Sequence, residues 1–256
     1  MHCDSGTLED WEHKGFVRLT SKLDASALSD LREFADDIAS GNYCRGGNSP
    51  VLVHHEQTPH GVAITRAENL VPNHSGFRAL TSSGTLVDAV GRLFGEQALL
   101  YKEKINFKQP GGAGFAPHQD ATAYKFADDH ITVMLAIDEA KIDNGCLEMA
   151  AGHHHDLLPT NGDGCIEPAI AASLPWQPVE LASGELLAFS SRTPHRSAPN
   201  TSPRQRRALF LTFNRRSAGG HRAAYYADKI RHLAEHEGDG TERVSTIGHF
   251  QGVSPT

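Results

Sequence analysis

The sequence predicts an α+β fold in which helices come first and a β-sandwich or barrel follows. Two observations support this class. Helical periodicity is found before about residue 95 and again near 221–236, whereas residues 99–213 contain short apolar runs separated by turn residues. Helices and strands segregated along the chain in this way are typical of α+β proteins. No fixed-period repeat and no linker divides the 256 residues, so we expect one domain over residues 1–256.

The N-terminal part begins with a short strand and a capped helix. Residues 16–19 form a short apolar run that indicates a strand. Asp24 is a residue type favoured at a helix N-cap, and apolar side chains recur at three- to four-residue spacing over residues 25–39. Gly41 follows this periodic segment and is expected to end the helix.

A second helix is expected over residues 84–94, with Gly95 as its C-cap. The intervening segment, residues 41–76, is rich in Gly, Asn, Pro and His, and we expect an irregular loop with short strands there. Long irregular loops beside a site often close over it, so this segment is also our candidate lid. A further helix is expected near residues 221–236.

The β-rich part is expected to contain six strands. Turn residues such as Asp143-Asn144-Gly145 and Ser183-Gly184 separate the apolar runs. The expected strands cover residues 99–107, 131–137, 146–149, 179–181, 186–189 and 208–213.

Composition and charge exclude several classes of function. The formal net charge is −7 and no long run of Lys or Arg occurs, which argues against a nucleic-acid partner or an anionic membrane partner. The N-terminus lacks a basic start with an apolar run, and no stretch approaches the length of a transmembrane helix, so we expect a cytoplasmic protein. The cysteines are scattered without C-x-x-C spacing, which favours reduced thiols over a zinc finger or a disulfide framework; they are Cys3, Cys44, Cys146 and Cys165.

His118 and Asp120 are candidate metal ligands, and His195 is a third. On a β-strand, residues i and i+2 point to the same face, so His118 and Asp120 could hold one ion while Gln119 points away. Two imidazoles and one carboxylate leave coordination positions open, a geometry that suits non-haem Fe(II) and O₂ chemistry. A glycine-rich run, residues 110–117, precedes the pair and permits close backbone approach at a pocket rim. The competing interpretation is a solvated loop pair, because His-x-Asp triplets are common.

Two further groups of polar residues are candidates for ligand binding. Arg206 and Arg207 directly precede an apolar run, and an inward arginine there could hold a carboxylate through two parallel hydrogen bonds. Strand alternation puts them on opposite faces without showing which face is inward. Lys102, Lys104 and Asn106 share one face of an expected strand, which is either exposed to solvent or the wall of a polar pocket.

The ordered set of motifs resembles a known family. Its members are the glycine-rich run, His118-x-Asp120, Asn144-Gly145-Cys146-Leu147, Gly152-x-His154, Pro194-His195-x-Ser197 and Arg206. In this order they resemble the phytanoyl-CoA dioxygenase family of Fe(II)/2-oxoglutarate-dependent oxygenases, over about residues 14–215.

The resemblance implies a double-stranded β-helix, a cupin-like jelly roll, at about residues 99–215 with flanking N-terminal helices. It implies that His118, Asp120 and His195 bind Fe(II). Arg206, eleven residues after His195, would pair with the far carboxylate of 2-oxoglutarate. Ser197 would lie near this cosubstrate, with Lys104 or Asn106 as further contacts. O₂ is the second cosubstrate and ascorbate a candidate reductant.

The substrate that the resemblance implies is a small polar molecule. Residues 101–108, 118–121 and 223–229 resemble a bacterial subgroup that includes 2-aminoethylphosphonate hydroxylases, which oxidise the carbon next to phosphorus. Charge-assisted donors suit a phosphonate, and the candidate donors are Arg192, Arg196 and Arg207. The candidate receptors for the substrate ammonium are Glu103 and Asp129.

Two alternatives remain open at this point. One keeps the class and changes the substrate to a natural product, an amino acid or a carrier-bound acyl group. The other changes the class to a non-catalytic, cupin-like metal-binding protein. Stereochemistry and oligomeric state are not indicated by any pattern in the sequence.

Overall fold

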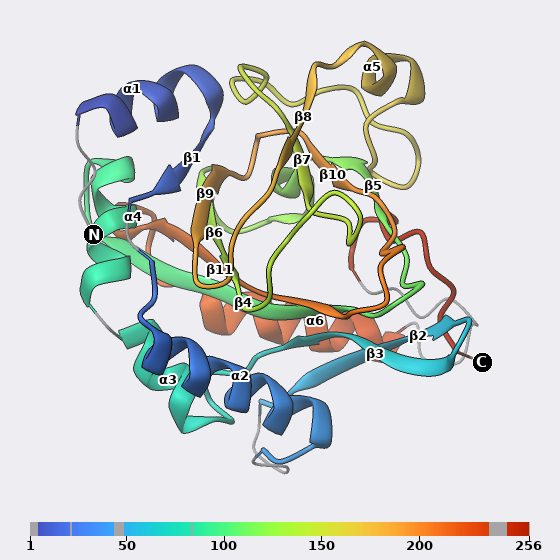
Figure 1. Ribbon diagram of the computed structural model, residues 1–256. Coiled ribbons are helices and arrows are strands. Elements are labelled where there is room, and N and C mark those ends of the chain that lie inside the picture. Colours follow the sequence, from blue (N-terminus) through green and yellow to red (C-terminus); the bar gives the residue numbers. More distant parts are fainter. Residues whose placement is uncertain (1–4, 21, 44–48, 83, 236–244, 256) are drawn as a thin grey trace.

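The computed structural model describes residues 5–20, 22–43, 49–82, 84–235 and 245–255 (Figure 1). The helices in these ranges are α1 (Ser5–Lys14), α2 (Ala25–Ser40), α3 (Ser75–Ser82), α4 (Gly84–Phe94), α5 (Pro168–Ser173) and α6 (Arg222–Glu235), with 3₁₀ turns η1 (Asp120–Ala123) and η2 (Arg216–Ala218). The strands are β1 (Phe16–Leu19), β2 (Leu52–Thr58), β3 (Gly61–Glu68), β4 (Ala98–Lys108), β5 (Phe115–His118), β6 (His130–Ala136), β7 (Leu147–Ala150), β8 (Trp176–Val179), β9 (Leu186–Ser190), β10 (His195–Ser197) and β11 (Arg206–Arg215).

The strands form two antiparallel sheets. The larger has the order β1-β9-β6-β11-β4-β3-β2 and the smaller the order β5-β10-β7-β8. Strands distant in sequence are neighbours in both, so the chain crosses between the sheets repeatedly. This arrangement is the jelly-roll core of an α+β fold, as the sequence analysis expected.

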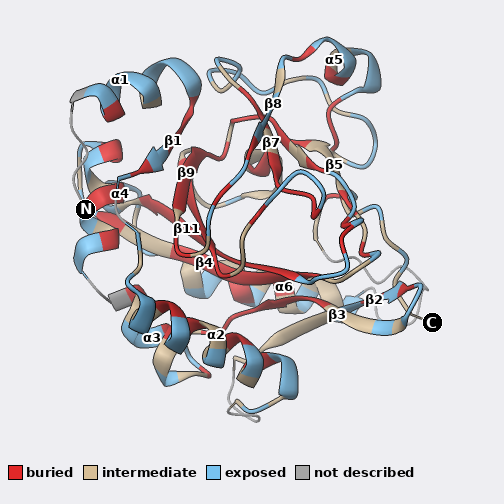
Figure 2. Cartoon of the chain, viewed as in Figure 1, coloured by how far each residue is buried: buried red, intermediate tan, exposed pale blue. Residues whose placement is uncertain are grey.

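The larger sheet has an outer face covered by helices and an inner face directed at the smaller sheet. Apolar side chains of α2, α3 and α4 pack with Ile105, Leu209 and Leu211 on the outer face. Met134, Phe189 and Phe210 pack with residues of β7 and β8 between the sheets. Figure 2 shows α2 and α3 buried where they meet the sheet and exposed on the other side.

The predicted helices and caps are confirmed. The Asp24 carboxylate accepts a hydrogen bond from the backbone N–H of Ala27 at 2.8 Å, as an N-cap should. Gly41 ends α2 in the left-handed region, with φ of 76°. Gly95 follows α4 with φ of 73°, and α6 corresponds to the helix expected near 221–236, apart from residue 236, which lies outside the described residues.

For residues 41–76 the expectation of strands is confirmed, whereas the expectation that most of the segment is an irregular loop is wrong for the described residues. β2 and β3 form a hairpin that extends the larger sheet, and α3 begins at Ser75. The hairpin lacks a clear apolar alternation because its inner face carries buried polar groups, including Arg66 and Glu68. The strand expected at 179–181 lies earlier, as β8, and the strands β5 and β10 were not predicted.

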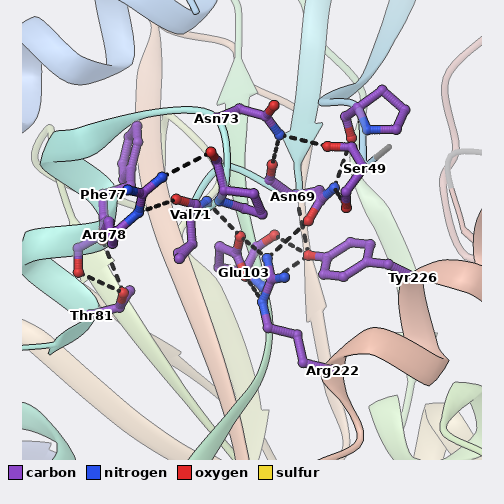
Figure 3. A network of polar contacts seen from close by, with 12 residues as sticks. Ser49, Asn69, Val71, Asn73, Phe77, Arg78, Thr81, Glu103, Arg222 and Tyr226 are labelled. Carbon is purple, nitrogen blue, oxygen red and sulfur yellow. Dashed lines mark hydrogen bonds and ion pairs between the residues drawn. The ribbon is translucent and has the colours of Figure 1, made fainter. Parts of the chain in front are cut away.

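A polar network closes the edge of β4 that β3 leaves free. β3 pairs with β4 only from Arg66 to Glu68, and beyond that point α6 covers the edge. Figure 3 shows Glu103 of β4 at the centre of this network, with Arg222 and Tyr226 of α6 directed at it.

Among the described residues, no helix combines the length and apolar content that a membrane-spanning segment needs.

Candidate active site

Three metal-ligand side chains meet between the sheets. His118 ends β5 and His195 begins β10, and the two are directly opposite each other in an antiparallel ladder. Asp120 is the first residue of η1. The ligand atoms of the three residues all lie within 4.8 Å of one another, and all three residues are buried. The structure therefore brings together the group that the sequence analysis selected.

The strand argument used to pair His118 with Asp120 is wrong in its geometry. β5 ends at His118, and the chain turns into a 3₁₀ helix at Asp120, so the two do not share a strand face. Gln119, between them, is fully buried and forms hydrogen bonds to two other segments of the chain. Its amide nitrogen donates to the carbonyls of Asp156 and Arg192 at 2.9 and 2.5 Å. Because Arg192 lies just before His195, this contact ties the two ligand-bearing segments together.

The two histidine rings have the orientation and the neutral charge state that metal ligands require. Nδ1 of His118 lies 2.7 Å from the carbonyl oxygen of Ala116, and Nδ1 of His195 lies 3.0 Å from that of Thr193. An Nδ1–H donated to a carbonyl leaves the Nε2 lone pair free for a metal. Burial lowers the pKa of both imidazoles, which keeps them neutral.

Asp120 supplies the negative charge of the group. Burial alone would raise its pKa, but the neighbouring Lys104 and Lys102 help to hold the pKa of this carboxyl well below its usual range. Two neutral imidazoles and one ionised carboxylate match the donor set that non-haem Fe(II) oxygenases use. The three residues can therefore form an iron site.

The inner face of β4 is the polar wall of the site. Lys102, Lys104, Asn106 and Lys108 alternate along it, and each is at most 8% exposed, so this face is not a solvated one. At roughly 3.4 Å per residue, the series spans about 20 Å. Burial and nearby cations lower the pKa of Lys104 well below its usual range, and an anion bound beside this lysine would favour its ammonium form.

One end of this wall is built around Arg206. It lies opposite Lys108 in the ladder and is 2% exposed. Its Nη2 donates to the carbonyl of Gly145 at 3.1 Å, while Nε and Nη1 have no hydrogen-bond partner among the residues that the structure describes. The ammonium of Lys108 donates to the hydroxyl of Ser197 at 2.8 Å. Free guanidinium donors beside an ammonium fit an incoming carboxylate.

Strand alternation resolves the question of the arginine faces. Ala208 and Phe210 pack between the sheets, whereas Leu209 and Leu211 pack against the helices. Arg206 shares the inner face with Ala208. Arg207 is on the outer face, where Asp138 and Asp36 bind its guanidinium at 2.8 and 2.6 Å. The prediction that Arg207 receives a phosphonate is therefore wrong.

The other basic candidates for phosphonate binding are engaged elsewhere. Arg196 donates to Glu148 at 2.8 Å and its guanidinium lies over the Trp176 ring. Arg192 donates to the carbonyl of His155 at 3.2 Å in an exposed position. Neither contributes to the polar wall of β4.

The two carboxylates suggested for a substrate ammonium are also paired. Glu103 accepts hydrogen bonds from Arg222 at 2.6 Å and from the backbone of Val71 at 2.9 Å, on the side of β4 that meets α6 (Figure 3). Asp129 accepts from Arg215 at 3.1 Å. Pattern reasoning failed here because an isolated charged residue in a sequence does not show its partner.

Several buried residues of the site were missed. Arg66 and Glu68 of β3 lie beside Asn106 and Lys104 in the ladder, with 2.7 Å between Arg66 Nε and Glu68 Oε1. Lys229 of α6 also contacts Glu68. The ring of His249 contacts that of His118 at a tilt of 39°, with 4.2 Å between ring centroids. No local signal in the sequence shows that Arg66 and Glu68 are buried or that the C-terminal tail reaches the metal ligands.

A jelly roll with two histidines, one carboxylate and a buried arginine with free donors defines a non-haem iron oxygenase that uses 2-oxoglutarate. The family model described as phytanoyl-CoA dioxygenase (PhyH) matches residues 11–208, and the chain belongs to this family. It is accordingly an Fe(II)- and 2-oxoglutarate-dependent dioxygenase.

Relatives with related chemistry cover most of the chain. A methylphosphonate hydroxylase of Gimesia maris is 42% identical over 248 residues, covering 96% of this chain and 94% of the relative. A 2-aminoethylphosphonate dioxygenase of an uncultured bacterium is 39% identical over 222 residues, covering 86% and 84%. The crystal structure of EctD from S. alaskensis with 2-oxoglutarate and 5-hydroxyectoine has a TM-score of 0.73 at 18% identity, covering 84% of this chain and 77% of that one. This last likeness concerns the fold.

Proposed function

We propose that this dioxygenase hydroxylates a small alkylphosphonate at the carbon next to phosphorus. The observation that carries the proposal is a pair of buried lysine side chains, Lys102 and Lys104, near the iron ligands. Within the described ranges neither forms an ion pair or a hydrogen bond, and each instead faces aromatic rings. A buried cation without a partner is costly unless a ligand supplies the opposite charge. The two phosphonate-oxidising relatives support the same substrate class.

The cosubstrate end of the site is the Arg206 end. We assign the far carboxylate of 2-oxoglutarate to Arg206 and Lys108, with Ser197 holding the lysine in place. Asn106 lies between this end and the metal ligands, and its side-chain oxygen has no hydrogen-bond partner among the described residues. His118, Asp120 and His195 would hold Fe(II), which supplies the oxidation of 2-oxoglutarate by O₂ to succinate and CO₂ with transfer of one oxygen atom to a C–H bond.

The substrate end begins at Lys104. Burial lowers the pKa of Lys104, and the nearby charge of Asp120, one of the metal ligands, partly opposes this effect. Nη1 of Arg66, on the neighbouring strand, has no hydrogen-bond partner in the described part of the chain. We assign the phosphonate oxygens to Lys104 and Arg66, an arrangement that brings the adjacent carbon close to the iron ligands.

The balance of buried charge fits a dianion. Four basic side chains surround this space, against two carboxylates; they are Arg66, Lys102, Lys104 and Lys229 against Glu68 and Asp120. Burial lowers the pKa of Lys102 and Lys104 and lowers the pKa of Lys229 to about 7, so a bound anion would stabilise the ammonium forms of these lysines. A phosphonate dianion supplies such an anion. A long acyl chain would instead put apolar surface against ammonium groups, which disfavours a carrier-bound lipid substrate.

Other features of the chain agree with an enzyme of this kind. A metal-binding protein without turnover would not require the unsatisfied donors of Arg206, whose retention costs stability. We further propose that residues 1–256 act as one oxygenase domain with only small-molecule partners, in the cytoplasm. Buried Cys146 and Cys165 are free thiols, as a reducing compartment maintains.

The test is succinate release by purified protein with Fe(II), ascorbate and 2-oxoglutarate, with and without methylphosphonate or 2-aminoethylphosphonate. Stimulation by a phosphonate, together with a new ³¹P NMR signal for the α-hydroxylated product, is the expected result. His118→Ala should abolish both signals. Lys141→Met, an exposed lysine paired with Glu139, is the matched control and should retain them. Succinate release that no phosphonate stimulates would contradict the proposed substrate class.

A further inference from the structure

Beyond Lys104, the polar wall ends in a group of aromatic rings. Tyr101, Tyr124 and Tyr225 come from β4, the segment after η1, and α6, and their rings contact one another at centroid distances of 5.3 Å (Tyr101–Tyr124) and 4.9 Å (Tyr101–Tyr225). Aromatic faces of this kind commonly bind ammonium groups of ligands. Here the place is already taken by the chain itself: the ammonium of Lys102 lies 4.5 Å from the Tyr124 centroid and 5.6 Å from that of Tyr225.

The carboxylates around the aromatic group are already paired. Glu68 contacts Arg66 and Lys229, and Glu103 contacts Arg222. Asp228 contacts Lys125 and Arg231. Asp120 is the metal ligand. Of the described carboxylates near this end of the wall, none is left to receive an ammonium.

Among these carboxylates, Glu68 is the strongest candidate to receive a substrate ammonium. Its Oε2 is buried without a hydrogen-bond partner among the described residues. Its Oε1, however, already contacts two cations, and those cations hold the pKa of the carboxyl well below its usual range against the effect of burial. A third cation would have to displace one of them.

From this arrangement we propose that Lys102 makes the site selective for phosphonates without an amino group. The inference rests on the proposed function, since it concerns the tail of the same substrate. With the phosphonate at Lys104 and Arg66, an alkyl tail extends toward Lys102 and the tyrosine rings. An uncharged tail packs on the rings, whereas a terminal ammonium meets the Lys102 ammonium at close range with no free carboxylate to offset the repulsion.

Propylphosphonate and 2-aminoethylphosphonate form the decisive pair of substrates. They have the same number of heavy atoms and differ by a terminal methyl or ammonium group, so size cannot explain a difference between them. The experiment measures kcat/KM for both by succinate release and ³¹P NMR, with methylphosphonate as the short reference. We expect at least tenfold higher kcat/KM for propylphosphonate than for 2-aminoethylphosphonate. Equal values, or a preference for the amine, would overturn the inference while leaving the proposed function intact.

Lys102→Met tests the residue itself. Removing the ammonium while keeping the length of the side chain should shift the ratio of the two kcat/KM values at least tenfold toward the amine. Lys141→Met should leave the ratio at its wild-type value. Calorimetric binding of both phosphonates to the protein loaded with Fe(II) and 2-oxoglutarate under argon gives the same ratio without turnover. An unchanged ratio in Lys102→Met, by both readouts, would overturn the assignment.

Two further outcomes separate the remaining possibilities. If none of the three phosphonates stimulates succinate release or binds, the proposed function itself fails. If the wild type prefers the amine and Glu68→Gln removes that preference, Glu68 is the ammonium receptor and the inference about Lys102 is wrong.

Discussion

Arg206 and Arg207 are neighbours in sequence but have opposite environments. Arg207, on the outer face of the larger sheet, donates to both oxygens of Asp138, at 2.8 and 3.0 Å, and to Asp36 at 2.6 Å. Arg206, on the inner face, has one hydrogen bond, to Gly145, and two nitrogens without a partner in the described part of the chain. Burial lowers the pKa of Arg206 to about 10, whereas hydrogen bonds to Asp138 raise the pKa of Arg207.

The same contrast holds between the two sides of β4. On the side that meets α6, Glu103 is fully buried and satisfied by Arg222 and backbone donors (Figure 3). On the inner side, Lys102 and Lys104 are buried without an anion. On the outer side the chain itself supplies the partners of Glu103 and Arg207. On the inner side it does so for Glu68, through Arg66 and Lys229, whereas Lys102 and Lys104 have no ion-pair partner among the described residues. Unsatisfied burial therefore distinguishes the binding surface from the scaffold better than residue type does.

The largest loss of activity is expected from substitution of a metal ligand on the inner side. Asp120→Ala should remove iron binding and reduce succinate formation by far more than the ~10–100-fold that loss of an outer-shell partner causes. Iron content after dialysis and the initial rate of 2-oxoglutarate consumption measure the two effects. Asp129→Ala, which removes a carboxylate paired with Arg215, is the control and should keep its iron. Full iron occupancy in Asp120→Ala would show that the ligand assignment is wrong.

The arginine pair tests the comparison directly. Arg206→Met should raise KM for 2-oxoglutarate by about 10–100-fold, since a charged hydrogen-bonded pair is worth about 1.5–3 kcal/mol, and should leave stability unchanged or higher. Arg207→Met should leave that KM near the wild-type value and lower the free energy of unfolding by ~2–4 kcal/mol, because Asp138 loses its partner. Steady-state kinetics and urea denaturation of both variants distinguish the roles. A raised KM in Arg207→Met together with a loss of stability in Arg206→Met would show that the two arginines have been assigned to the wrong faces.

Buried histidines give the inner face a dependence on pH. Burial lowers the pKa of His54 from its usual 6.5 to about 4, so between these values the unfolded chain binds a proton that the folded chain does not. Stability should therefore fall as the pH drops from 6.5 to 4, by up to about 3 kcal/mol from this residue. Urea denaturation of His54→Gln at pH 7 and pH 5 should show a smaller loss than the wild type. His55→Gln, at the exposed neighbouring position, should lose as much stability as the wild type.

The smallest effect is expected in the network of Figure 3. The hydroxyl of Tyr226 accepts from the backbone N–H groups of Asn69 and Glu103, both at 3.2 Å, and donates to the carbonyl of Glu103 at 3.0 Å. Tyr226→Phe leaves these buried groups unsatisfied and should lower the free energy of unfolding by ~1–3 kcal/mol. KM for 2-oxoglutarate should not change. A raised KM without loss of stability would place this network in the site rather than in the scaffold.

Periodicity and turn chemistry were sufficient for the elements whose side chains follow a simple in–out pattern. The caps of α2 and the positions of β4, β6, β9 and β11 could be predicted for this reason. The β2–β3 hairpin could not, because Arg66 and Glu68 are polar and buried, which breaks the alternation that indicates a strand. The expected lid at 41–76 is largely this hairpin.

The metal-ligand group was predicted correctly from the order of motifs, whereas the expectation that His118 and Asp120 share a strand face was wrong. The order of motifs identified His118, Asp120 and His195, although Asp120 lies on a 3₁₀ turn rather than on a strand. Lys108 and His249 could not be found from the sequence. Lys108 depends on a cross-strand partner, Arg206, nearly a hundred residues away, and His249 depends on the path of the C-terminal tail.

The most direct test of the central claim is calorimetric titration of methylphosphonate into protein loaded with Fe(II) and 2-oxoglutarate under argon. The account predicts saturable binding by the wild type and by Lys141→Met, and at least ~10-fold weaker binding by Lys104→Met, because a charge-assisted contact is lost. Binding by Lys104→Met as tight as that of the wild type would contradict the claim that the unpaired cations of the inner face form the anion site.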